Sequence, residues 1–333
     1  MPDMHQLLGQ LFIVGYQGID PKTEFLDFVA ELQLGGVILF GENCTDVDRL
    51  QQALHTLRRQ VPTDRPLLVA IDQEGGRTCR LQEKRALLYS ATSYAKRNDL
   101  EGFTQDYHRA AEYMLSLGVN LNLAPVADIL LNPDNSCLAG RCYGKEPQQV
   151  ANFVTRAVEL MHRSHMLCCL KHFPGLGQAT IDPHLAVAEA AYDLATWTER
   201  ERIPFAAGIK AGADMVMTTH LKVPAIDQVI ATGSSAVVNG LLRQDLGFDG
   251  VVITDEMAML GADALGDMGA RTVAALQAGH DIVLFGQNLA NARRAYEAVS
   301  EAVSSRQLSP EVITRALDRV ANLKQRLISQ KAV

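Results

Sequence analysis

The sequence predicts a single (β/α)8 barrel, and three observations lead to this fold class. Short runs rich in Val, Ile and Leu alternate with longer stretches of helical periodicity, which is typical of parallel strands joined by crossover helices. Eight such runs fit a chain of 333 residues folded as one barrel. No linker rich in Pro or Ser divides the chain, so we expect one domain over residues 1–333.

The eight predicted strands are separated by intervals long enough for a helix. They are LFIVGY (11–16), GVILF (36–40), LLVAID (67–72), VNLNLAP (119–125), MLCCLKH (166–172), DMVMTTH (214–220), GVVITDE (250–256) and HDIVLFG (280–286). Intervening segments such as 147–165 and 194–212 place an apolar residue at every third or fourth position, as amphipathic helices do. The final segment, 309–329, opens with Ser and Pro as a capped helix, and we expect it to pack on the outside of the barrel.

A doubly wound open sheet would show the same alternation of strands and helices. Its dinucleotide-binding fingerprint is absent, because the nearest glycine cluster, GLGQAT (175–180), lacks the third glycine. The barrel is therefore favoured.

Composition and charge indicate a partner of low molecular mass. Of the 333 residues 47% are hydrophobic, which is enough for a large core, and the formal net charge is −7. That charge argues against a nucleic-acid or acidic-membrane surface. The N-terminal stretch has no basic region, and its apolar run is too short for a signal peptide or a membrane span. We expect a cytoplasmic, monomeric protein.

The cysteines do not follow a metal-binding or disulfide pattern. The six residues stand at positions 44, 79, 137, 142, 168 and 169, without a CxxC pair. We expect reduced thiols, with Cys168 and Cys169 as buried small hydrophobic residues rather than redox groups.

Polar residues gather where the predicted strands end. The third strand ends in IDQEGGRTCRL, the fourth in LAPVAD, the fifth in LKHFPGLG, the sixth in TTH and the seventh in ITDEM. In a barrel these ends meet at one mouth, where the reacting groups lie. The mouth thus receives a set of charged and polar side chains, which are Asp72, Arg80, Arg141, Lys171, His172 and Asp255.

Two of these residues allow a simpler interpretation. Asp255 directly follows the apolar run GVVI, and both it and Asp72 could cap a following helix. Two carboxylates at the same barrel end, surrounded by cations, favour a polar-ligand site instead. Sugars suit such a site, because their hydroxyl groups donate and accept hydrogen bonds and an oxocarbenium-like transition state needs a nearby anion.

Asp182 and His184 lie two residues apart in the segment QATIDPHLAVAE. In an extended segment both side chains point to one side, so the carboxylate can fix the imidazole as a general acid/base. Pro183 favours extended geometry for Asp182. A surface turn is the alternative for an isolated DxH, unless the pair lies near Asp255.

A metal site built from His172, His184, Asp182 and Asp255 is disfavoured. The sequence has no HxH or HExxH pair, and Lys171, Arg80 and Arg141 would oppose a divalent cation. We expect neither a metal nor another cofactor.

Several motifs in register resemble glycoside hydrolase family 3. These are IDQEGGRTCRL, NLNLAPVADI, LAGRCYG, KHFPGLG with DPH, LGFDGVVITDEM and ALQAGHDIVLF, and the resemblance as a whole runs from about residue 8 to residue 290. Within the family the chain looks like the single-domain bacterial β-N-acetylhexosaminidases of peptidoglycan recycling.

The resemblance implies a role for each matching residue. Asp255 would be the nucleophile of a retaining mechanism, and His184, held by Asp182, would protonate the leaving oxygen and later activate water. Five further residues match positions that bind N-acetylglucosamine, namely Asp72, Arg80, Arg141, Lys171 and His172. The chain departs from the family pattern at Leu176, Gln178 and Pro183, and in the segment 82–97.

Two alternatives to an exo-β-N-acetylglucosaminidase remain open. The first is a relative that acts on another β-glycoside or as a phosphorylase, since a neutral imidazole does not repel incoming phosphate as a carboxylate would. The second is a non-catalytic sugar-binding protein on an enzyme scaffold.

Overall fold

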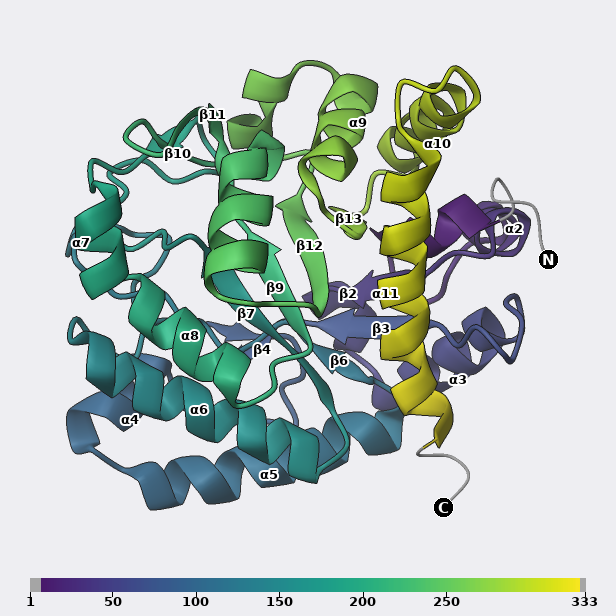
Figure 1. The fold of residues 1–333 in the computed structure, drawn as a ribbon. Helices are drawn as coiled ribbons and strands as arrows, with labels where there is room; N and C mark the ends of the chain where they lie inside the picture. The colour runs from purple at the N-terminus through teal and green to yellow at the C-terminus, as the bar shows by residue number, and fades with distance from the viewer. Residues whose placement is uncertain (1–6, 330–333) are drawn as a thin grey trace.

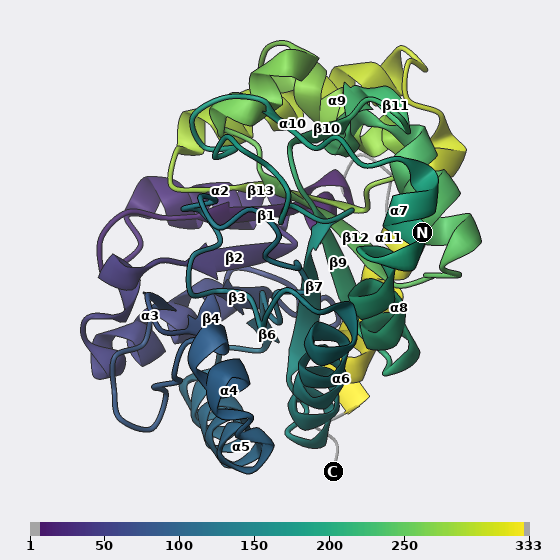
Figure 2. The same ribbon diagram turned by 90° about the vertical axis from the view of Figure 1, so that its left-hand side faces the viewer.

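The computed structural model describes residues 7–329 and shows a closed barrel of eight parallel strands surrounded by helices (Figures 1 and 2). Neighbouring strands follow the chain, and the barrel closes where the last strand pairs with the first. The strands are β1 (Phe12–Gly15), β2 (Gly36–Leu39), β3 (Leu68–Ile71), β6 (Leu121–Asn122), β7 (Leu167–Phe173), β9 (Met215–Thr218), β12 (Val251–Glu256) and β13 (Ile282–Phe285). The predicted fold class is confirmed, and each predicted strand range contains one of these strands except at β7, which runs one residue further.

The helices form a ring outside the barrel. They are α2 (Thr23–Leu32), α3 (Val47–Arg58), α4 (Ala91–Arg97), α5 (Leu100–Leu117), α6 (Pro147–Arg163), α7 (Leu194–Glu199), α8 (Arg202–Lys210), the π-helix η4 (Ala236–Asp245), α9 (Met268–Ala278), α10 (Leu289–Ser304) and α11 (Pro310–Ser329). Side-chain caps fix several starts; the Asp46 carboxylate, for example, accepts from the backbone of Asp48 and Arg49 at the start of α3.

The segment 194–212, predicted as one helix, forms the two helices α7 and α8. Pro204 explains the break, because a residue without an N–H group fits the first turn of a helix but not its interior. The helix must therefore restart shortly before Pro204, and α8 begins at Arg202.

Short strands and 3₁₀ turns lie outside the eight-stranded barrel sheet. The short strands are β4 (Gln73–Gly75), β5 (Thr78–Cys79), β8 (Ala188–Glu189), β10 (Leu221–Val223) and β11 (Asp227–Ile230). The 3₁₀ turns are η1 (Leu8–Leu11), η2 (Gly41–Cys44), η3 (Ala231–Gly233) and η5 (Leu260–Leu265). The β4–β5 hairpin follows β3 and η5 follows β12, so both lie at the carboxyl ends of barrel strands.

The last helix, α11, runs along the outside of the barrel, as the sequence predicts (Figure 1). Its Lys324 is buried, and the ammonium group donates to the Gln10 side chain and to the carbonyl of Gly35, both at 2.7 Å. These bonds tie α11 to the segments that precede β1 and β2.

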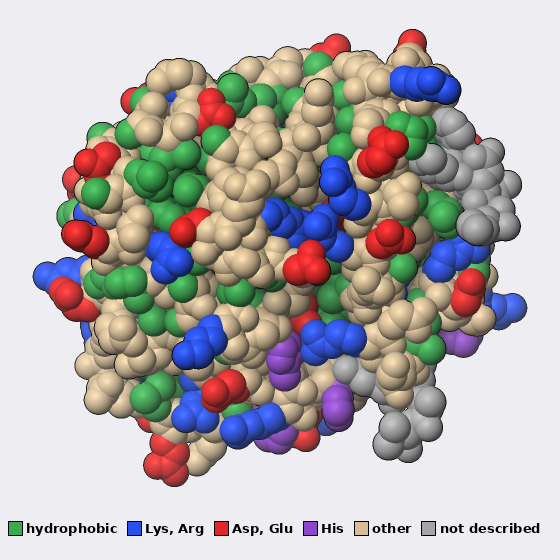
Figure 3. All heavy atoms as spheres, in the orientation of Figure 1, with side chains coloured by type: hydrophobic (Ala, Val, Ile, Leu, Met, Phe, Trp, Pro, Cys, Tyr) green, Lys and Arg blue, Asp and Glu red, His purple; other side chains and the backbone are tan. Residues whose placement is uncertain are grey.

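All six cysteines are buried and unpaired. Within residues 7–329, no helix is both long enough and apolar enough to cross a membrane. Lys and Arg side chains occur next to Asp and Glu side chains on the face shown in Figure 3.

Candidate active site

A cavity of about 330 Å³ lies at the carboxyl ends of the barrel strands. Seven of the eight predicted site residues line it, and these are Asp72, Arg80, Arg141, Lys171, His172, His184 and Asp255. The eighth, Asp182, is bonded to His184. The folded chain therefore brings together all eight residues that the sequence singles out.

The floor of the cavity is a network of buried ion pairs. The Lys171 ammonium lies 2.7 Å from an Asp72 oxygen and 2.6 Å from a Glu74 oxygen. The Arg141 guanidinium donates two hydrogen bonds of 2.8 Å to the two Glu74 oxygens, which is the bidentate geometry that fixes both side chains. The Arg80 guanidinium lies 3.3 Å from the second Asp72 oxygen.

This network sets the protonation of its members. Burial alone would raise the pKa of Glu74, but Arg141 and Lys171 outweigh it and hold that pKa far below its usual range. Burial acts on Asp72 in the same direction, and Lys171 and Arg80 likewise lower its pKa overall. Burial would lower the pKa of Lys171, yet Asp72 and Glu74 raise it. The carboxylates and the ammonium group are thus all charged at neutral pH.

His172 is held in one tautomer by two neighbours. Its Nδ1 lies 2.6 Å from an Asp128 oxygen, and its Nε2 lies 3.2 Å from Arg141 Nη2. Because a guanidinium can only donate, Nε2 accepts and Nδ1 carries the proton. Asp128 also accepts from the backbone N–H groups of His172 and Leu176, so it orients both the ring and the start of the following loop.

Asp255 and Glu256 end strand β12 at the rim of the cavity, and both line it. Asp255 does not cap a helix, because its Oδ1 accepts from the backbone of Glu256 at 2.8 Å and the cap of α9 is Asp267. Burial, together with the neighbouring Asp255, raises the pKa of Glu256 to about 7, although backbone N–H groups oppose the shift. Glu256 can therefore hold or release a proton near neutrality, directly beside Asp255.

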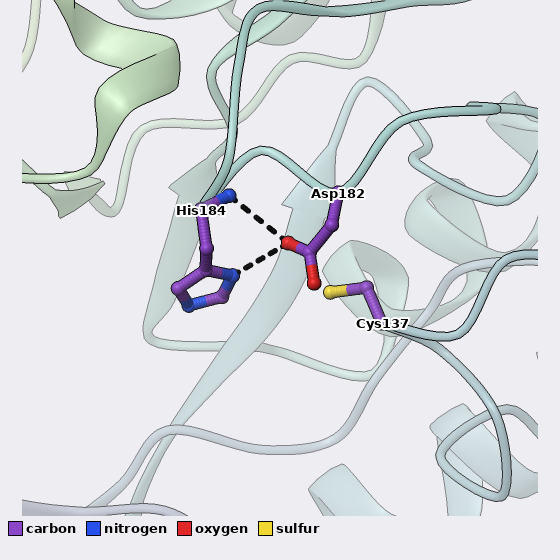
Figure 4. A group of neighbouring side chains, drawn as sticks. All are labelled: Cys137, Asp182 and His184. Atoms are coloured by element: carbon purple, nitrogen blue, oxygen red, sulfur yellow. Dashed lines mark hydrogen bonds and ion pairs between the residues drawn. The ribbon is translucent and has the colours of Figure 1, made fainter.

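Asp182 and His184 form the predicted pair (Figure 4). Asp182 Oδ1 lies 2.7 Å from His184 Nδ1 and accepts from the His184 backbone N–H at 2.9 Å. Burial would raise the pKa of Asp182, but the backbone and the ring of His184 outweigh it and lower that pKa. The ring nitrogen Nε2 is left for the ligand, and the His184 side chain is 60% exposed.

The expected extended geometry of this segment is wrong. The backbone carbonyl of Asp182 accepts from Leu185 at 2.9 Å and from Ala186 at 3.3 Å, so the chain turns at Pro183 and His184. In such a turn an Asp side chain bonds the backbone N–H two residues later, and this brings the carboxylate to the imidazole without an extended chain.

Close contacts with other segments hold the loop that carries the pair in place. Gly177 lies so close to the backbone of Ile129 that an added Cβ would stand 1.6 Å from its carbonyl oxygen, so this glycine is required for packing. Further along, the Gly261 N–H donates to the Pro183 carbonyl at 2.9 Å. The loop is thereby bonded to η5, which follows the strand of Asp255.

The residues that depart from the family pattern do not all line the cavity. Leu176 lines the cavity, and Pro183 lines it next to His184. Among the described residues, none in the segment 82–97 lines the cavity. Part of that segment instead supports the hairpin after β3, because the Gln73 side chain donates to the carbonyls of Leu81 and Ala86 at 3.0 Å.

Sequence reasoning missed four residues of the site, which are Glu74, Asp128, Cys137 and Glu256. Glu74 lies two positions after Asp72 and therefore on the same side of an extended chain, which was the available signal. Asp128 ends the quoted motif LAPVAD. Cys137 lines the cavity beside Asp182, and no local pattern marks it.

Two groups of described side chains could hold a metal ion. One is Cys137 with Asp182 and His184, and the other is His162 with Cys168 and Asp214.

Comparisons with known proteins show which family the chain is similar to. The model of the glycosyl hydrolase family 3 N terminal domain matches residues 4–323. A beta-hexosaminidase of Xanthomonas axonopodis pv. citri is 32% identical over 280 residues, which cover 82% of this chain and 83% of that protein. Beta-hexosaminidase A of Pseudoalteromonas piscicida is 30% identical over 93% of this chain, but the chain spans only 56% of that relative.

Solved structures of family 3 enzymes are similar to this chain over nearly its whole length. A family 3 β-N-acetylglucosaminidase from a Paenibacillus species superposes with a TM-score of 0.94 and 32% identity, over 98% of this chain and 63% of that one. A β-N-acetylhexosaminidase from Beutenbergia cavernae gives a TM-score of 0.90 and 30% identity, over 98% of this chain and 99% of that one.

Proposed function

The chain belongs to glycosyl hydrolase family 3, and we propose that it is a retaining exo-β-N-acetylglucosaminidase acting on peptidoglycan-derived saccharides. One observation carries the proposal: the Asp182–His184 pair and Asp255 open into the same cavity. A binding protein needs neither a nucleophile nor an acid, whereas a glycosidase needs both.

The proposed reaction has two steps. In the first, the Asp255 carboxylate attacks the anomeric carbon and forms a covalent glycosyl-enzyme, while His184 Nε2 gives its proton to the leaving oxygen. In the second, the neutral His184 takes a proton from water, which attacks the same carbon and frees Asp255. In this proposal Asp182 stabilises the imidazolium and fixes the ring, and its 2.7 Å contact with His184 Nδ1 supports that role.

Sugar binding falls to the charged floor of the cavity. Asp72 and Glu74 can accept from sugar hydroxyl groups, while Lys171 and Arg141 can donate to them. Because the floor is already ion-paired, the donors and acceptors are in place before a ligand arrives. The volume of about 330 Å³ is small for a ligand pocket and favours one terminal sugar ring, hence exo action.

The substrate class rests on the relatives. The curated relatives named above are beta-hexosaminidases, and the two solved structures are a β-N-acetylglucosaminidase and a β-N-acetylhexosaminidase. We propose that this chain acts on a small saccharide as a monomer, with no nucleic-acid or membrane partner. Six buried, unpaired cysteines fit a reducing compartment such as the cytoplasm.

A phosphorylase is the second candidate, because a histidine acid/base is compatible with an anionic acceptor. His184 is neutral after it has protonated the leaving group, so it does not repel phosphate as a carboxylate would.

Initial rates on 4-nitrophenyl N-acetyl-β-glucosaminide and on the matching glucoside, each with and without phosphate, test these proposals together. Turnover of the N-acetyl substrate alone, independent of phosphate, is expected. Acceleration by phosphate with release of a sugar 1-phosphate would indicate the phosphorylase, and preference for the glucoside would change the substrate. Binding of N-acetylglucosamine without turnover at high protein concentration would indicate a sugar-binding protein.

A further inference from the structure

Exposed apolar side chains occur in the two segments that carry the proposed acid/base and follow the proposed nucleophile. Ile181 and Leu185 flank the Asp182–His184 pair, and Leu260 stands in η5, which follows β12. Their exposed fractions are 46%, 71% and 51%. Within residues 7–329 eight large hydrophobic side chains are exposed, and this group makes up three of them. Single exposed leucines are common on protein surfaces, whereas a group of them beside a cavity indicates a binding surface.

The two segments lie side by side. The Gly261 N–H donates to the Pro183 carbonyl at 2.9 Å, and a Cβ at Gly261 would stand 3.2 Å from the Ala186 carbonyl oxygen. Leu185 lies between Pro183 and Ala186 in the chain, and Leu260 directly precedes Gly261. The two leucines therefore come from adjoining backbone segments. We call Ile181, Leu185 and Leu260 the apolar rim.

The apolar rim continues the lining of the cavity. His184 and Met259 line the cavity, and the residue after each of them is an exposed leucine of the rim. Pro183 adds a further apolar side chain to the lining on this side. A ligand that extends out of the cavity past His184 therefore meets apolar side chains.

We propose that the apolar rim binds the aglycone, the group that leaves with the cleaved oxygen, and that the protein prefers uncharged aglycones with an alkyl or aryl group. This inference rests on the proposed function. His184 gives its proton to the leaving oxygen, so the aglycone must lie beside His184 when the bond breaks. The cavity of about 330 Å³ accommodates one sugar ring, which leaves the aglycone outside it, next to Leu185.

The gain in affinity comes from water released from both surfaces. An exposed leucine and an alkyl chain each keep apolar area in contact with water, and contact between them removes that area from water. Because the aglycone is still beside His184 in the transition state, the contact raises kcat/KM.

The charges of the two segments disfavour an anionic aglycone. Apart from His184, the charged side chains of segments 181–189 and 256–265 are all carboxylates, which are Asp182, Glu189, Glu256 and Asp263. Arg271 is bonded to Asp263, and Lys222 lies opposite Glu189 where β8 pairs with β10, so both cations are already matched by carboxylates. Among peptidoglycan-derived saccharides, we therefore expect those with a neutral aglycone to be cleaved faster than those whose aglycone carries a carboxylate.

Alkyl N-acetyl-β-glucosaminides test the proposal, because methanol, butanol and octanol are leaving groups of nearly equal basicity. Values of kcat/KM are measured below the concentration at which the octyl glycoside forms micelles. We expect kcat/KM to rise at least about tenfold from the methyl to the octyl glycoside. It should fall again when the octyl chain ends in a carboxylate.

Leu185→Ser and Leu260→Ser each remove part of the rim, and the fold should tolerate both because the side chains are exposed. The ratio of kcat/KM for octyl to that for methyl is taken within each protein, which cancels differences in active fraction and in the rate of bond cleavage. The ratio should fall at least about threefold in each variant and approach unity in the double variant. Leu100→Ser changes an exposed leucine at the start of α5 and should keep the wild-type ratio.

Equal kcat/KM for the methyl and octyl glycosides, or an unchanged ratio in the double variant, would overturn the proposal. The methyl and octyl thioglycosides resist hydrolysis, so calorimetry with them gives a second readout that does not depend on turnover. Tighter binding of the octyl thioglycoside that is lost in the double variant, by a protein that cleaves no glycoside, the 4-nitrophenyl substrate included, would leave the apolar rim standing as a binding surface and refute the proposed function. Equal binding of both thioglycosides by the wild-type protein would count against the rim in either case.

Discussion

Replacement of Lys324 by Met should change how the stability of this protein depends on pH. Lys324 is 2% exposed, and the described partners of its ammonium group are the uncharged oxygens of Gln10 and Gly35. Within residues 7–329, no carboxylate forms an ion pair with Lys324, and none contributes to the shift of its pKa. Burial, and to a smaller extent Arg65, lowers the pKa of Lys324 from 10.5 to about 7.

The sign and size of the effect follow from this pKa. Between the folded-state pKa of about 7 and the unfolded-state value of 10.5, the unfolded chain binds a proton that the folded chain does not, so stability rises with pH. Below the folded-state pKa both states bind the proton, and the slope vanishes. From about pH 6 to about pH 9, Lys324 should add roughly 2.5 kcal/mol to the free energy of unfolding.

Urea unfolding of the wild type and of Lys324→Met over this pH range measures the effect. Met leaves two acceptors without a donor, which lowers stability by an amount that does not depend on pH. The difference between the two proteins should therefore grow by about 2.5 kcal/mol as the pH rises. The same substitution at the exposed Lys96 is the control. A difference that stays constant over the range would refute the idea that burial lowers the pKa of Lys324 in the folded protein.

Three further predictions concern the cavity. Asp255→Asn should lower kcat at least about 10³-fold without loss of the circular dichroism of the native fold, and substantial residual turnover would contradict the nucleophile assignment. His184→Ala should lower the rate about 10²- to 10⁴-fold on saccharides with a basic leaving group but much less on aryl glycosides, so equal losses would count against the acid role. Glu74→Gln leaves Lys171 and Arg141 buried with less negative charge and should cost about 3–5 kcal/mol in urea unfolding. Because the pKa of Glu74 is depressed in the folded state, this loss should be full at neutral pH and shrink as the pH falls below the ordinary range of a carboxylate; an unchanged difference in acid would argue against the ion pairs.

The strands could be predicted because the interior of a barrel requires apolar runs. The residues at which the strands end could not be predicted in the same way. The predicted strand covers 119–125, yet β6 covers only Leu121–Asn122. Pro125 has no N–H to donate, and beyond it the chain keeps only an isolated bridge between Val126 and Lys171.

The candidate site was predictable where side chains follow strands and less so where loops shape it. The strand ends correctly indicated Asp72, Lys171, His172 and Asp255 as neighbours. The turn at Asp182 depends on the hydrogen bonds of one loop, which periodicity does not encode. Cys137 is brought to the pair by a loop from a different strand, so only the folded chain reveals the contact.

The bond between Gly261 and Pro183 has a consequence for protein engineering. It joins the loop that bears His184 to the turn that follows Asp255, and a Cβ at Gly261 would stand 2.8 Å from the Pro183 oxygen and 3.2 Å from that of Ala186. The two segments thus pack directly against each other, although about 70 residues separate them in the chain. Substitutions in one segment are therefore expected to depend on the other. A loop graft that changes leaving-group preference should therefore exchange both segments together. A graft of one segment alone would lose the hydrogen bond or the close contact that the other segment provides.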